Sequence, residues 1–183
     1  MNKRKTVLNL KNKNIVLIGF MGVGKGTIAR ALVKKMKRFS VDTDDLIESM
    51  ENRKIKDIFT TNGEAYFRKL EKKTAKWLEK NVKKAVISTG GGFFKVDNLD
   101  KIGTIVYLQS SFEAILQRLK EHENADLKLA KRPLLTDLEK AKALFHERSV
   151  LYEAKADIII NVENRSIQEI VTDLEKLFTK DKN

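Results

Sequence analysis

The stretch IVLIGFMGVGKGT, at residues 15–27, decides how the rest of the chain is interpreted. Its first four residues are apolar and mainly β-branched, which predicts a short buried strand of a parallel sheet. A glycine-rich turn and Lys25 follow, and the next residues carry apolar side chains at helical spacing, at Ala29, Leu32, Val33 and Met36. This order predicts a phosphate-binding loop, because glycines let backbone N–H groups surround an anion and the helix N-terminus adds positive potential.

We call residues 19–27 the phosphate loop. Lys25 is predicted to reach the β- and γ-phosphates of a nucleotide. The usual pattern has Ser or Thr directly after the lysine, where the hydroxyl ligates Mg²⁺, but here Gly26 takes that place and Thr27 comes next. Phosphate binding does not need that side chain, whereas direct ligation of the metal by a hydroxyl is left open. The alternative interpretation is an ordinary glycine turn between a strand and a helix.

The composition is that of a globular α/β protein. The chain has 183 residues, of which 42% are hydrophobic and 34% charged, so we expect one domain over residues 1–183, with a frayed tail at 1–13. It has no cysteine, which excludes disulfides and cysteine metal sites and is compatible with the cytoplasm. No signal-peptide core and no apolar run of membrane-spanning length is found, so no membrane association is expected.

The net charge of +12 raises the possibility of a nucleic-acid partner. However, the lysines after Gly63 fall at helical spacing, opposite a stripe formed by Phe67, Leu70, Thr74 and Trp77. These lysines are Lys69, Lys72, Lys73 and Lys76. We interpret them as a solvated helix face and expect no nucleic-acid partner.

Four further strands are predicted at residues 38–41, 85–88, 104–108 and 157–161, which makes five strand–helix units. Helices are predicted at 43–51 and 55–60, with Gly63 breaking the chain before a long helix over 64–80. Later helices are expected to start at capping boxes formed by Ser110 with Glu113, Thr136 with Glu139, and Ser166 with Glu169.

Two carboxylates, Asp42 and Asp44, follow the second predicted strand. Ligands bind beyond the carboxyl ends of strands in open parallel sheets. Carboxylates at this end could hold the water shell of a metal or accept a proton from a substrate hydroxyl. The alternative is that either one caps the helix that follows.

Three glycines, Gly90, Gly91 and Gly92, end the third strand. They would let a ligand approach the backbone, unless they are only a flexible loop. Arg68 could pair with Glu64 one turn earlier, but a cation in the first helical turn suggests a more specific partner. Arg148 lies on the inward stripe of its helix, so it meets either a buried acid or an anionic ligand in a cleft.

The polar segment over residues 121–135 predicts a mobile lid that ends in Arg132 and the chain's single proline, Pro133. Arg118 lies just before this segment. Arg165 follows the last strand, where it is either a loop cation or a group that stacks on a base.

Taken together, these motifs resemble the shikimate kinase family, from about residue 14 to residue 178. The resemblance rests on the phosphate loop, on Asp42-Thr43-Asp44, on Phe67-Arg68, on the three glycines, on Arg132-Pro133-Leu134-Leu135, and on Arg148 with Leu151-Tyr152. It implies a three-layer P-loop kinase fold, with a five-stranded parallel sheet flanked by helices and a mobile lid. It also implies a cytoplasmic, monomeric enzyme that uses ATP and Mg²⁺ to phosphorylate the 3-hydroxyl of shikimate.

By this resemblance, each candidate residue has an expected role. The nucleotide would be held by Gly22, Val23, Gly24, Lys25, Gly26 and Thr27, with Arg132 closing over the γ-phosphate, Arg118 assisting and Arg165 against adenine. Asp44 would orient or deprotonate the attacking hydroxyl. The shikimate carboxylate would be clamped by Arg68 and Arg148, beside Gly90, Gly91 and Gly92. Asp42, through water, and Thr27 are the candidate metal residues.

Three other hypotheses stay open at this point. The chain could be a kinase of the same fold that acts on gluconate or a nucleotide. It could be a non-catalytic binding module whose metal site decayed at Gly26. It could also be a basic, nucleic-acid-binding NTPase.

Overall fold

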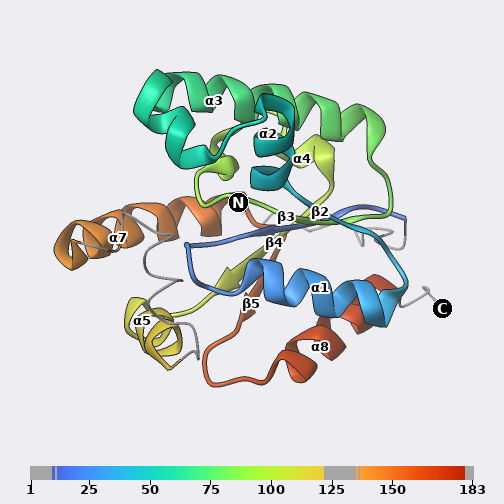
Figure 1. Ribbon diagram of the computed structural model, residues 1–183. Coiled ribbons are helices and arrows are strands. Elements are labelled where there is room, and N and C mark those ends of the chain that lie inside the picture. Colours follow the sequence, from blue (N-terminus) through green and yellow to red (C-terminus); the bar gives the residue numbers. More distant parts are fainter. Residues whose placement is uncertain (1–9, 11, 122–134, 136, 180–183) are drawn as a thin grey trace, which may run out of the picture.

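The computed structural model describes residues 10, 12–121, 135 and 137–179 (Figure 1). Five strands form one sheet in the order β2-β3-β1-β4-β5, and every neighbouring pair is parallel. The strands are β1 (Ile15–Ile18), β2 (Ser40–Asp42), β3 (Val86–Ser88), β4 (Thr104–Gln109) and β5 (Ile158–Asn161). The expected five-stranded parallel sheet is therefore confirmed.

Helices cover both faces of the sheet, which confirms the three-layer arrangement. Helices α2 (Thr43–Glu51), α3 (Ile55–Asn81) and α4 (Leu99–Ile102) lie on one side (Figure 1). Helices α1 (Lys25–Met36) and α8 (Ile167–Thr179) pack against each other on the other side. The remaining helical elements are a 3₁₀ turn (Phe93–Lys95), α5 (Phe112–Lys120) and α7 (Leu138–Lys155). Among the described residues, no helix is both long and apolar enough to span a bilayer.

The central position of β1 in the sheet explains why this strand is apolar throughout. β1 lies between β3 and β4, and all four of its side chains are buried. At the sheet edge, β5 alternates between half-buried and exposed residues. A strand with helices on both faces must be apolar throughout, whereas an edge strand can leave side chains in water.

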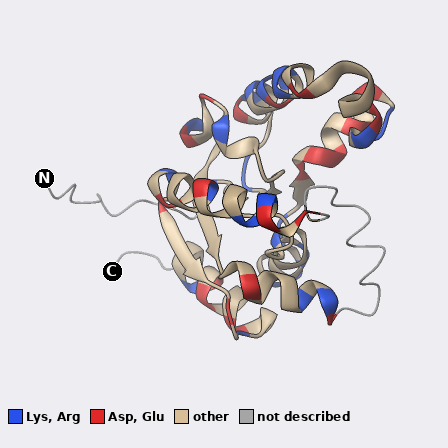
Figure 2. Cartoon of the chain, turned by 90° about the vertical axis from the view of Figure 1, so that its left-hand side faces the viewer, with Lys and Arg blue, Asp and Glu red and all other residues tan. Residues whose placement is uncertain are grey.

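Two details differ from the sequence prediction, the start of the second strand and the exposure of Trp77, and a third is confirmed. The second strand begins at Ser40 rather than at residue 38. The side chain of Phe39 is 88% exposed, although its carbonyl still accepts a hydrogen bond from the N–H of Val86 in β3. The predicted break at Gly63 is confirmed, because its backbone is not helical (φ 76°, ψ 176°) and two helices meet there within the element labelled α3. Trp77 is 47% exposed, whereas Ala75 and Leu78 face the core in its place. The predicted lysine face is confirmed as exposed, and Figure 2 shows Lys and Arg mixed with Asp and Glu along the helices.

One predicted helix start is confirmed, and two others begin at a different capping residue. Ser166 and Glu169 form the expected capping box, since each side chain accepts a hydrogen bond from the other's backbone N–H. In α5, however, Ser111 is the cap and accepts from the N–H of Ala114, because Ser110 is buried at the end of β4. In α7 the cap is Asp137, while Thr136 lies outside the described residues.

A buried side chain, Asn14, links three segments just before β1. Its Nδ2 donates to the carbonyls of Val82 at 2.7 Å and Ile102 at 2.8 Å. Its Oδ1 accepts from the N–H of Ala85 at 3.0 Å. Asn14 therefore satisfies backbone groups beside β3 and β4, the two neighbours of β1, and helps to set their alignment.

We expect Asn14→Ala to lower the free energy of unfolding by about 2–4 kcal/mol, because three buried backbone groups lose their partners. Urea denaturation followed by circular dichroism would measure the change. Asn81→Ala, which removes an exposed side chain bonded to the Trp77 carbonyl, is the matched control and should cost less than about 1 kcal/mol. Equal losses in the two variants would contradict this role for Asn14.

Candidate active site

The carboxyl ends of three neighbouring strands meet at one edge of the sheet. In the parallel register, Ser88 at the end of β3 pairs with Leu17 of β1 on one side and with Asp42 of β2 on the other. The phosphate loop, the two aspartates and the three glycines therefore emerge side by side. This is the place where open parallel sheets bind ligands.

The phosphate loop encloses the ammonium of Lys25. This side chain is buried, and its Nζ donates to the carbonyls of Gly19 at 2.7 Å and Phe20 at 3.1 Å. Helix α1 begins at Lys25, and no side chain caps its N-terminus. The Phe20 ring packs against those of Phe112 and Phe145, so α5 and α7 anchor the loop. A fixed turn with a helix N-terminus and an enclosed ammonium is suited to bind phosphate.

Arg118, on α5, lies against the phosphate loop. Its Nη2 donates to the carbonyl of Gly22 at 3.1 Å, and a Cβ on Gly24 would lie 3.6 Å from its Nη1. Arg165 lies elsewhere, at the end of β5, where it pairs with Asp173 of α8 at 2.6 Å. Arg132 lies outside the described residues, as does the predicted lid apart from Glu121 and Leu135.

The two aspartates have different environments. Asp42 is the N-cap of α2, and its Oδ1 accepts from the N–H of Asp44 at 2.9 Å. The carboxylate of Asp44 lies against Gly90, where an added Cβ would come within 2.5 Å of Oδ1. Burial, reinforced by the charge of Asp42 and opposed by that of Lys25, raises the pKa of Asp44 to about 7. A carboxyl group with this pKa can take up a proton near neutral pH.

Arg68 is held by two acids of its own helix. It pairs with Glu64 at 2.8 Å, as expected, and also with Glu71 at 2.5 Å. Glu71 is buried, and this burial raises its pKa although Arg68 and Arg148 oppose the shift. Its Oε1 has no hydrogen-bond partner among the described residues. The Arg68 guanidinium occupies the space that a side chain on Gly92 would need.

Arg148 is buried, with 6% of its surface exposed, as its place on the inward stripe predicts. Its Nη1 donates to the carbonyl of Gly91 at 3.2 Å, while its Nε has no partner among the described residues. The charges of Glu64 and Glu71 both interact with it electrostatically. Arg148 therefore shares its surroundings with a buried acid and also retains an unused donor.

Sequence reasoning gave no role to several residues that shape this site. Glu71 is the main one, and the signal was available, because it falls on the buried stripe of α3 together with Phe67, Leu70 and Thr74. An ionisable residue on such a stripe needs a partner. The others orient the glycine segment through hydrogen bonds: Thr43 with the Gly90 N–H, Thr89 with the Leu17 carbonyl, and Tyr152 with the Gly91 carbonyl.

The residues near the phosphate loop fit a hydrated Mg²⁺ better than a metal caged by protein. Among the described residues, no group of three or more His, Cys, Asp or Glu could hold a metal. Mg²⁺ bound to a nucleotide commonly keeps several waters and needs only one or two protein oxygens. Asp42 can offer the oxygen that its capping bond does not use. Thr27 is exposed, and its hydroxyl accepts from Arg30 at 3.5 Å.

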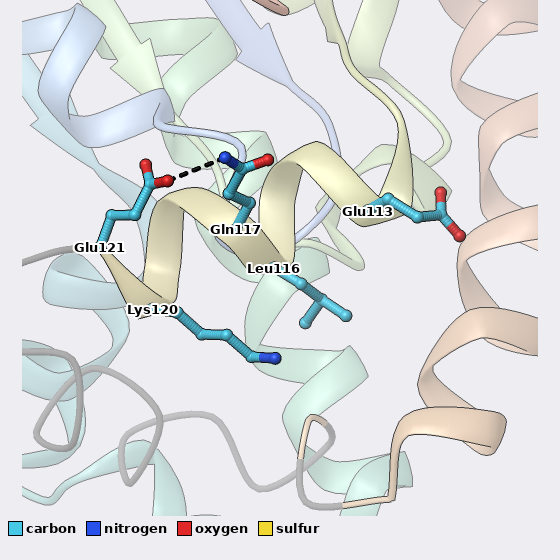
Figure 3. A pocket seen from close by; sticks show the side chains of 5 residues that line it. All are labelled: Glu113, Leu116, Gln117, Lys120 and Glu121. Carbon is cyan, nitrogen blue, oxygen red and sulfur yellow. Dashed lines mark hydrogen bonds between the residues drawn. The ribbon is translucent and has the colours of Figure 1, made fainter.

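A separate cavity of about 460 Å³ lies on the surface of α5. It is lined by Glu113, Leu116, Gln117, Lys120 and Glu121, and Gln117 donates to Glu121 within it (Figure 3). None of these residues comes from the phosphate loop or a strand end. This cavity is therefore not part of the candidate site.

We expect Asp44→Asn to stabilise the fold at pH 8. Folding raises the pKa of this carboxyl from 3.8 to about 7, so its stabilising contribution is complete below about pH 4 and is lost as the pH rises through 7. Asparagine has no charge to desolvate. The variant should therefore exceed the wild type by roughly 1–2 kcal/mol at pH 8, or roughly 2–8 °C, and the gain should shrink toward pH 5.

Calorimetry at pH 5, 6 and 8 would measure this difference. Asp45→Asn changes the exposed neighbouring carboxylate and is the control, with a much smaller dependence on pH. If Asp44→Asn melts at or below the temperature of the wild type at pH 8, the charge of Asp44 does not destabilise the folded state.

Residues 21–178 match the family model described as shikimate kinase. The shikimate kinase of Helicobacter hepaticus is 42% identical over 156 residues, covering 85% of this chain and 90% of the relative. That of a Sulfurihydrogenibium species is 42% identical over 173 residues, covering 92% and 97%. The solved structure of the Acinetobacter baumannii shikimate kinase in complex with shikimate is 31% identical, with a TM-score of 0.78 and coverage of 90% and 92%. The chain belongs to the shikimate kinase family of phosphotransferases.

Proposed function

We propose that this protein transfers the γ-phosphoryl group of ATP to the 3-hydroxyl of shikimate, giving shikimate 3-phosphate and ADP. The product would serve the route to chorismate and the aromatic amino acids. The observation that carries the proposal is the placement of Arg68, Arg148 and Asp44 around the three glycines, next to the phosphate loop. Arg68 and Arg148 can bind the carboxylate of shikimate, while Asp44 would contact the hydroxyls of shikimate.

The two arginines are suited to exchange a protein partner for a ligand. The side chain of Glu64 is 63% exposed, and such a surface ion pair contributes little to stability. A substrate carboxylate can therefore take its place on Arg68. Glu71 is buried and keeps the guanidinium oriented. Arg148 adds its unpartnered Nε, and a guanidinium can bind a carboxylate through two parallel hydrogen bonds.

Asp44 would act on the attacking hydroxyl. Phosphoryl transfer passes through a loose transition state in which the hydroxyl loses its proton late, so positioning matters more than base strength. Asp44 can accept a hydrogen bond from the hydroxyl, hold it in line, and then take up its proton. Its raised pKa makes this protonated form accessible near neutral pH.

The phosphate loop would hold the nucleotide. Its amides from Gly22 to Thr27 and the ammonium of Lys25 would neutralise the phosphates, and Arg118 is close enough to assist. Mg²⁺, when bound, would add charge neutralisation at the β- and γ-phosphates, and Asp42 is the carboxylate suited to hold its waters. Closure of Arg132 over the γ-phosphate, contact of Arg165 with adenine, the monomeric state and the cytoplasmic location remain predictions.

The direct test is ADP production with MgATP and a panel of shikimate, gluconate and nucleoside monophosphates. Stimulation by shikimate alone supports the proposal. Stimulation by another acceptor instead would indicate a different small-molecule kinase. ATP binding without turnover on any acceptor would favour the decayed module. RNA binding that weakens steeply with salt would be needed to revive the nucleic-acid hypothesis.

We expect Arg148→Ala to lower kcat/KM for shikimate by roughly 100-fold or more, with KM for ATP nearly unchanged, because a charge-assisted pair to the acceptor is lost. Arg148→Lys keeps the positive charge but loses the planar guanidinium. Its kcat/KM should therefore lie between that of the wild type and that of Arg148→Ala. Steady-state kinetics would measure this, with Lys142→Ala at the exposed ion pair between Lys142 and Glu113 as the control. Wild-type turnover in Arg148→Ala would remove this residue from the site.

Asp44→Asn should lower kcat by roughly 10²- to 10⁴-fold. Asparagine can still contact the acceptor but cannot take up its proton. Equilibrium binding of shikimate should therefore change far less than kcat, and the higher stability expected at pH 8 would show that the loss is not due to unfolding. If kcat is retained, the acceptor is aligned without this carboxylate.

A further inference from the structure

A hydroxyl from another strand borders the space left by the missing side chain of Gly26. An added Cβ at Gly26 would lie 3.9 Å from the Oγ of Ser88 and 3.5 Å from the Nη1 of Arg30. In the usual phosphate-binding pattern, a Ser or Thr at this position offers its hydroxyl to Mg²⁺. The structure thus brings a hydroxyl from β3 close to the position where the first turn of α1 lacks one.

The register of the sheet places Ser88 beside the metal candidate, Asp42. The two residues are partners across β2 and β3, and partners on adjacent parallel strands project their side chains to the same face. Because Ser88 Oγ lies near Gly26, that face is the one on which α1 starts. Asp42, Ser88 and the beginning of α1 therefore border one small region beyond the strand ends.

Ser88 is buried, but its hydroxyl still has positions that could bind a ligand. Only 4% of its surface is exposed, and in the described part of the chain its hydroxyl oxygen is not one of the fully enclosed side-chain atoms that lack a partner. A hydroxyl has one donor and two acceptor positions, so it can still bind a metal ion or a metal-bound water. By contrast, Thr27 is exposed and its hydroxyl accepts from Arg30. Thr27 is one residue after Gly26, and so about 100° farther around the helix.

We propose that Ser88 supplies the metal-facing hydroxyl that Gly26 lacks, and that Ser88 and Asp42 together hold the hydrated Mg²⁺ of the bound nucleotide. This proposal deepens the proposed function and depends on its use of MgATP. In this proposal Ser88 of β3, and not Thr27, provides the hydroxyl that faces the metal. Hydroxyl and carboxylate oxygens are hard ligands that suit Mg²⁺ or its waters, and the phosphates complete the set.

The test is the gain in nucleotide affinity that Mg²⁺ provides. The probe is AMP-PNP, an ATP analogue that is not turned over, titrated calorimetrically into the whole protein with MgCl₂ or with EDTA. Ser88→Ala should reduce the Mg²⁺-dependent gain about 5- to 10-fold and leave the affinity in EDTA unchanged. Ser110→Ala is the matched control, because Ser110 is also a buried serine at a strand end, that of β4, and it should behave as the wild type.

A rescue variant separates a metal role from a packing role. A Cβ added at Gly26 would make only ordinary van der Waals contacts, at 3.5 and 3.9 Å, so the backbone there accepts a side chain. In the double variant Gly26→Ser, Ser88→Ala, the Mg²⁺-dependent gain should return. An unchanged gain in Ser88→Ala overturns the proposal, and so does a loss that Gly26→Ser fails to restore.

These outcomes are distinct from a failure of the proposed function. Shikimate-stimulated ADP release is measured on the same wild-type protein. If shikimate gives no stimulation but the Mg²⁺-dependent gain depends on Ser88, the acceptor assignment fails and the role of Ser88 stands. If shikimate is phosphorylated but Ser88→Ala keeps the full gain, the proposed function stands and the role of Ser88 is refuted.

Discussion

The backbone after β3 has no side chains at the point where three charged groups converge, and the rest of the site depends on this. A Cβ at Gly90 would lie 2.5 Å from the Asp44 carboxylate, and one at Gly92 would collide with the Arg68 guanidinium. At Gly91 the Arg148 guanidinium would be 3.4 Å away. The three charged residues come from α2, α3 and α7, which are far apart in the chain. They meet because the glycine segment leaves room for all of them.

This convergence carries an electrostatic cost. Asp44 and Glu71 are desolvated, and burial raises the pKa of both. The cations that offset them, Lys25, Arg68 and Arg148, are themselves largely enclosed. Such a cluster is a poor source of stability, since the desolvation of buried ion pairs often offsets their attraction. Its value lies in fixing the positions of donors and acceptors before a ligand arrives, and active sites commonly lose stability in this way.

The sequence predicted best where local pattern and long-range geometry agree. The phosphate loop could be predicted because strand, turn, lysine and helix are contiguous, and Arg148 could be placed because its helix has a clear inward stripe. Glu71 follows the same rule on α3 but was hidden by the pair that Glu64 offers to Arg68. The shift of a cap from Ser110 to Ser111 depends on where β4 ends. Sequence alone does not decide this between adjacent serines.

Asp44 links the two halves of the site. Lys25, inside the phosphate loop, lowers its proton affinity, while Asp42 and Glu71 raise it. Lys25 lies in the phosphate loop and Glu71 lies beside Arg68, so this one carboxylate responds to charge in both parts of the candidate site. In the proposed reaction, charge on either side of this carboxylate would change its proton affinity. Asp44 lies on the first turn of α2 and against Gly90, so the proposed nucleotide site and the proposed shikimate site would share this carboxylate.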